Sequence, residues 1–120
     1  MNNRIKSFKY AIKGILNAFE QPNMLIHLVI AFLVILAGLA LNISHSDWNS
    51  IMLAIGFVLT AESFNTAIEK LTDLVSPQHN LLAGQVKDIA AGAVLISAVT
   101  ASIIGLFVFI PEIISLFKVL

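Results

Sequence analysis

Three long apolar runs decide what this chain can fold into. They cover residues 23–41, 48–71 and 88–110, and each is long enough to cross the roughly 30 Å hydrocarbon core of a bilayer as a helix. The chain has 120 residues, of which 58% are hydrophobic and only 12% are charged. A soluble domain usually carries about 25% charged residues. We therefore predict an all-α membrane protein, with one integral membrane domain over residues 1–120.

The segment 1–21 precedes the first apolar run and has the pattern of an amphipathic surface helix. Its apolar residues recur at helical spacing on one side, and lysines occupy the other side: Ile5, Phe8, Ile12, Ile15 and Phe19 against Lys6, Lys9 and Lys13. A basic amphipathic helix of this kind lies in the headgroup plane. Pro22 disfavours helix at Gln21, so we expect the chain to turn there. A cleaved signal peptide is the competing interpretation, but the apolar run is too long and too poorly terminated for one.

The basic residues predict the orientation of the chain. Of its seven Lys and Arg residues, only Lys118 follows the third apolar run. The others precede the first run or flank the connection between the second and third runs. Cytoplasmic loops carry an excess of Lys and Arg. We therefore expect the N-terminus and the 72–87 connection in the cytoplasm, and the 42–48 loop and the C-terminus outside.

The second apolar run ends in a polar helical face. At about 100° per residue, Glu62, Asn65, Glu69 and Asp73 fall within one narrow arc of the helix. A carboxylate inside an apolar span costs several kcal/mol unless it meets cations, water or a ligand. This face is therefore the first candidate for a functional site. His27, one turn inside the first span, is expected to hydrogen-bond a neighbouring helix.

The carboxylates near the cytoplasmic boundary outnumber the nearby cations. They are Glu20, Glu62, Glu69, Asp73 and Asp88, against Lys70 and Lys87. Clustered carboxylates suit Mg²⁺, which binds one or two of them together with substrate phosphates. Hydrogen bonds between helices would explain the same residues, and the spacing does not decide between these two interpretations. The absence of cysteine excludes disulfides, thiol catalysis and cysteine metal sites.

The third run and its flanks predict close packing between helices. Small residues recur every four positions at Ala93, Ser97, Ala101 and Gly105, a pattern that lets helix backbones approach closely. Because three helices make a small core, we expect a homo-oligomer. We also expect Ser46 or Asp47 to cap the second span. Pro111 should mark the far end of the third span, with the tail 113–120 lying along the outer interface.

Two motifs resemble the prokaryotic diacylglycerol kinase family. They are Glu62-x-x-Asn65-Thr-Ala-Ile-Glu69-x-x-x-Asp73 and, after a short loop, Lys87-Asp88-x-x-Ala-x-Ala-Val-Leu. The N-terminal Tyr10-x-x-Lys13-Gly14 is similar to a further motif of that family, although Glu20 follows it at a shorter distance than in some members. The resemblance covers nearly the whole chain. It implies a small membrane kinase with a surface helix and three spans, assembled as a homotrimer.

The resemblance also implies roles for individual residues. Glu62 would be the general base for the lipid hydroxyl, with Asn65 supporting it at the substrate. Magnesium would be held by Glu20 and Glu69. The ATP site would be formed by Tyr10, Glu20, Glu69, Gln78, His79, Asn80, Lys87 and Asp88. Lys87 would pair with phosphate and Asp88 would orient the nucleotide. The implied partners are a membrane lipid, ATP, Mg²⁺ and further copies of the chain, and no nucleic acid.

The lipid acceptor stays open between undecaprenol and diacylglycerol. Both offer a primary hydroxyl on an apolar body, so the charge pattern does not separate them. The ending Ile-Ile-Gly-Leu-Phe-Val-Phe-Ile-Pro-Glu is more similar to the undecaprenol branch of the family. A proton- or ion-coupled transport protein is the alternative function, with Glu62 and Glu69 as relay groups. Residues 48–59 hold no ionisable group, however, so no relay crosses the bilayer.

Overall fold

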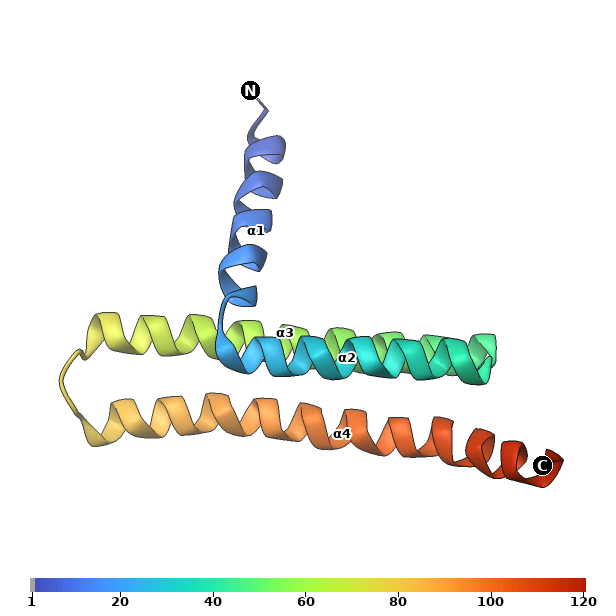
Figure 1. Ribbon diagram of the computed structural model, residues 1–120. Helices are drawn as coiled ribbons and strands as arrows, with labels where there is room; N and C mark the ends of the chain where they lie inside the picture. Colours follow the sequence, from blue (N-terminus) through green and yellow to red (C-terminus); the bar gives the residue numbers. More distant parts are fainter. Residues whose placement is uncertain (1) are drawn as a thin grey trace.

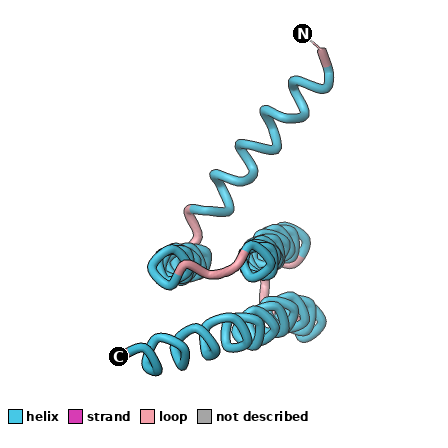
Figure 2. The backbone as a smooth tube through the Cα atoms, turned by 90° about the vertical axis from the view of Figure 1, so that its right-hand side faces the viewer, coloured by secondary structure: helices cyan, strands magenta, loops and turns pink. Residues whose placement is uncertain are grey.

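The computed structural model describes residues 2–120, and every regular element in that part of the chain is a helix. The helices are α1 (Asn3–Phe19), α2 (Pro22–Leu41), α3 (His45–Val75) and α4 (Leu81–Val119). Residue 1, the first of the predicted surface segment, lies outside the described residues. The three longer helices run side by side, whereas α1 leaves them at a steep angle (Figures 1 and 2).

In the described part of the chain three helices are long and apolar enough to cross a membrane, namely α2, α3 and α4. This confirms the predicted all-α membrane architecture. Helix α3 is the central element, since it packs against α2, α4 and α1, while α2 and α4 share a much smaller contact. The end of α3 and the start of α4 form a hairpin that extends past the corner between α1 and α2 (Figure 1).

The break between α1 and α2 lies where the sequence predicts it. Gln21 is extended, with φ −73° and ψ 138°, and Pro22 is the first residue of α2. Proline suits that position because its fixed φ fits the first turn, where its missing N–H is not needed. The end of α1 is tied to α3 because Lys70 Nζ donates a hydrogen bond of 2.6 Å to Asn17 Oδ1.

The helix ends differ from the predicted spans because capping side chains set them. The N-cap of α3 is Ser44, whose hydroxyl accepts from the Asp47 backbone N–H, so the prediction of Ser46 or Asp47 was wrong. Asn80 caps α4 and accepts from the N–H groups of Leu82 and Ala83. Helix α4 also continues through Pro111 as far as Val119. Hydropathy locates the membrane-crossing part of a helix, whereas caps decide where the helix begins.

The turn between α2 and α3 closes one end of the bundle. Asn42 takes the left-handed conformation with φ 51°, which ends α2 and reverses the chain. Ile43, Ile51 and Val108 form a buried apolar cluster beside this turn. Gly38 packs against the Trp48 ring so closely that a Cβ there would lie 2.8 Å from a ring carbon. We call this region the turn end of the molecule.

Candidate active site

Glu62 is buried just past the middle of α3, away from the turn end, with only 2% of its surface exposed. Its carboxylate Oε2 lies 3.6 Å from Nε2 of His27, which belongs to α2. The pair therefore joins the first two spans at a polar contact. A buried carboxylate persists only where neighbouring groups or a ligand compensate its desolvation. His27 was not among the predicted site residues, because a single histidine in an apolar helix gives no signal of its partner.

Asn65 and Glu69 lie about one and two turns after Glu62 on the same face of α3. The Asn65 side-chain amide donates a 3.0 Å hydrogen bond to Glu69 Oε1, which fixes one carboxylate oxygen. Asn65 is itself buried, and its Oδ1 has no hydrogen-bond partner within residues 2–120. Buried amide oxygens are almost always satisfied by protein, water or a ligand. This acceptor, together with the Glu69 carboxylate, supplies the hard oxygen atoms that Mg²⁺ prefers.

Lys87 and Asp73 link the ends of α4 and α3. Their charged atoms lie 2.5 Å apart, and the Lys87 side chain is 40% exposed and that of Asp73 64% exposed. Lys87 is therefore held at the hairpin that connects the two helices. Asp88, the next residue, is exposed on α4. In the loop itself Gln78 and His79 are exposed, while the Asn80 side chain is occupied in capping α4.

Two predicted residues belong to α1 or its end. Tyr10 is exposed on α1, with the Lys13 ammonium 5.8 Å from the centre of its ring. Glu20 is the C-cap residue of α1 and is exposed at the corner before α2.

The predicted site residues fall into separate groups within one chain. Glu62, Asn65 and Glu69 share one face of α3, Lys87 and Asp88 lie on the hairpin, and Tyr10 and Glu20 lie on α1 or at its end. Across residues 2–120, no three His, Asp or Glu side chains lie close enough together to enclose a metal ion. A metal bound here would need few protein ligands, which matches the tendency of Mg²⁺ to complete its shell with phosphates and water.

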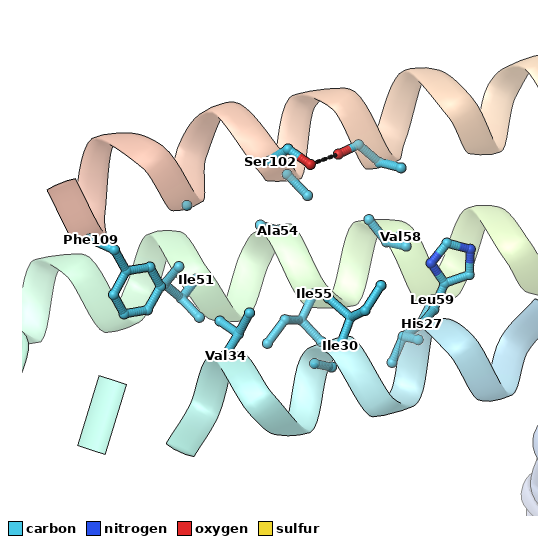
Figure 3. Close-up of a pocket in the computed structure, with 14 residues that line it drawn as sticks. His27, Ile30, Val34, Ile51, Ala54, Ile55, Val58, Leu59, Ser102 and Phe109 are labelled. Carbon is cyan, nitrogen blue, oxygen red and sulfur yellow. Dashed lines mark hydrogen bonds between the residues drawn. The ribbon is translucent and has the colours of Figure 1, made fainter. Parts of the chain in front are cut away.

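A cavity of about 250 Å³ opens between α2, α3 and α4. His27 lies at one end of it and Phe109 at the other (Figure 3). Its wall is almost wholly apolar and includes the small residues Ala98, Ala101 and Gly105 on α4. Two of these belong to the predicted small-residue stripe. The cavity can accept an apolar chain, and its one ionisable lining residue among those described is His27.

Comparison with known proteins places this arrangement in a family. The family model described as prokaryotic diacylglycerol kinase matches residues 9–109. An undecaprenol kinase of Bacillus subtilis is 40% identical over 113 residues, which span 93% of this chain and 92% of that protein. A diacylglycerol kinase of Synechocystis is 37% identical over 116 residues, or 95% of this chain and 66% of that protein. These matches favour the kinase interpretation over the transport alternative. The chain therefore belongs to the prokaryotic diacylglycerol kinase family and is a membrane lipid kinase.

Proposed function

We propose that this protein transfers the γ-phosphoryl group of ATP, with Mg²⁺, to the hydroxyl of undecaprenol or diacylglycerol at the cytoplasmic membrane interface. The observation that carries the proposal is the Glu62 carboxylate, buried in an apolar span beside His27 and one turn from the Asn65–Glu69 pair. Undecaprenol is the favoured acceptor, because the relative named undecaprenol kinase matches over nearly its full length.

Glu62 acts as the general base in this proposal. It takes the proton of the lipid hydroxyl while the hydroxyl oxygen attacks the γ-phosphorus, and the bond to the β-phosphate oxygen breaks to release ADP. Phosphoryl transfer depends chiefly on alignment and charge neutralisation. A carboxylate in a largely dry setting suits that task, since it accepts a proton without solvent reorganisation. Asn65, on the same face, supports the acceptor side of the site.

The residues present fit a magnesium ion. The unpartnered Asn65 Oδ1 and the half-buried Glu69 carboxylate offer hard oxygen donors on one helix face. Glu69 and Glu20 would hold the metal, and the metal would neutralise charge on the ATP phosphates. Asn65 keeps the Glu69 carboxylate oriented through its amide. Glu20 would approach this pair from the corner after α1, or come from a second protomer.

The hairpin and α1 would hold the nucleotide. Lys87 would be able to leave Asp73 and bind a phosphate, because a solvent-accessible ion pair contributes little to the stability of the fold and breaks readily. Asp88 would orient the nucleotide. The remaining contacts would come from residues of α1 and of the loop before α4, namely Tyr10, Gln78, His79 and Asn80. The basic residues before α2 and in the 72–87 region support placing this whole side in the cytoplasm, where ATP is available.

Assembly as a homotrimer would complete the site. Large apolar side chains stay exposed along α4, including Leu95, Ile96 and Phe107, and only lipid or further helices can cover them. The predicted site groups are also spread over separate parts of one chain. A second protomer could therefore supply Glu20 or the hairpin residues to Glu62. Sedimentation of the purified protein in detergent should give the mass of three chains, and a monomeric active species would contradict this.

The decisive experiment is an acceptor panel with purified protein. Undecaprenol, a shorter polyprenol and diacylglycerol would each be assayed with labelled ATP and Mg²⁺ in one detergent. We expect phosphorylated lipid with both classes and the higher kcat/KM for undecaprenol. A higher kcat/KM for diacylglycerol would reverse the acceptor assignment. No lipid phosphate with any acceptor, from protein that is folded and assembled, would overturn the proposed reaction.

A further inference from the structure

His27 contacts both the candidate base and the apolar cavity. Its Nε2 lies 3.6 Å from Glu62 Oε2, and its side chain is 19% exposed. It also lines the cavity between α2, α3 and α4, whereas Glu62 does not (Figure 3). The imidazole therefore borders both the carboxylate and one end of the space that an apolar chain can enter.

The distance between the two side chains is longer than a hydrogen bond, which requires about 2.7–3.2 Å between N and O. The 3.6 Å separation exceeds that range by only about 0.4 Å, so a small movement of either side chain would bring the pair into hydrogen-bond contact. An Nε2–H donor at this position would hydrogen-bond the carboxylate and hold it in one orientation. An apolar residue at this position would fill the same volume without orienting the carboxylate.

We propose that His27 is a positioning residue that orients the Glu62 carboxylate toward the acceptor hydroxyl at the polar end of the cavity. This rests on the proposed role of Glu62 as the base. The hydroxyl of the lipid stops where the apolar wall gives way to the imidazole, and its tail extends along the cavity toward Phe109. The histidine acts through Glu62 and does not itself take the proton.

The first test compares His27→Leu with His27→Gln in the full-length protein. Leucine keeps the volume but loses the donor, and we expect kcat to fall about 10- to 100-fold, the size of effect that misplacing a catalytic group produces. The KM for Mg-ATP should not change. Glutamine restores an N–H at similar reach, so it should recover most of the lost kcat. The exposed His45, in the first turn of α3, provides a matched control, and His45→Leu should leave both constants unchanged.

The second test repeats His27→Leu in a Glu62→Gln background. If His27 acts through Glu62, adding His27→Leu to the Glu62→Gln variant should lower the kcat of that variant by less than about twofold. An equal loss of kcat in both backgrounds would overturn the proposal, as would wild-type kcat for His27→Leu. Loss of assembly in both the leucine and glutamine variants would also overturn it, since the role would then be structural. Near-normal turnover of Glu62→Gln alone would instead show that the proposed base is wrong.

Discussion

The two ends of α3 differ in the kind of side chain that they bury. At the turn end, Ile43, Ile51 and Val108 are buried together and Gly38 lets the Trp48 ring touch its backbone. We call the other half of α3, around Glu62, Asn65 and Glu69, the acidic end. On this half of α3 the buried residues are all polar, and Asn65 Oδ1 has no hydrogen-bond partner among the described residues.

Because of this difference, we expect the turn end to contribute mainly to stability and the acidic end mainly to ligand binding and catalysis. Close apolar packing holds one arrangement of side chains in place, and each lost contact reduces the free energy of unfolding. A buried polar group without a partner costs free energy until something binds it. The turn end therefore holds α2, α3 and α4 in register, and that register presents the acidic end to a ligand. Substitutions at the two ends should have different signatures, in Tm at one and in turnover at the other.

The largest effect should follow Glu62→Gln at the acidic end. Removing the base should lower kcat by a factor on the order of 10²–10⁴. The affinity for Mg-ATP and the assembly should persist, because glutamine has the same shape and the proposed metal ligands are untouched. Steady-state kinetics, ATP binding and sedimentation on one preparation would check this. Glu112→Gln makes the same chemical change far along α4 and should be silent. Near-normal turnover of the Glu62→Gln variant would remove the main distinction between the ends.

A smaller effect is expected for Glu69→Gln. The glutamine oxygen can still accept the hydrogen bond from Asn65, so the fold should survive. The lost charge should raise the magnesium concentration needed for half-maximal activity by about tenfold, or roughly 1.4 kcal/mol of binding free energy. A magnesium titration of activity measures this directly. If the titration curve coincides with that of the wild type, Glu69 has no part in holding the metal.

The smallest effect should come from Gly38→Ala at the turn end. Alanine improves helix propensity by roughly 0.5–1 kcal/mol. Its Cβ would lie 2.8 Å from the Trp48 ring, however, and such overpacking typically costs about 1–3 kcal/mol. We expect a lower Tm, with unchanged turnover per folded molecule. Gly56→Ala is the matched control, since nothing lies within 4 Å of its added Cβ. Equal Tm values for the two variants would show that the turn end is not rigidly packed.

Much of the architecture could be predicted from the sequence. The apolar runs identified α2, α3 and α4, and Pro22 identified the break after α1. The helix ends were less predictable. Ser44, Ser46 and Asp47 are all good capping residues, and which one caps α3 depends on where Asn42 reverses the chain. The metal and nucleotide assignments stay predictions, because they depend on groups that lie apart within one chain.

The sequence by itself determined the class of this protein, because hydropathy and helical periodicity are local properties of the chain. It also determined that Glu62, Asn65 and Glu69 share a face, since residues on one helix keep fixed angular positions. Only the tertiary structure decided which group meets that face. His27 lies far from Glu62 in sequence, and nothing in its neighbours indicates the contact. Partners on different helices are brought together by packing at the turn end, and that register is a property of the whole bundle.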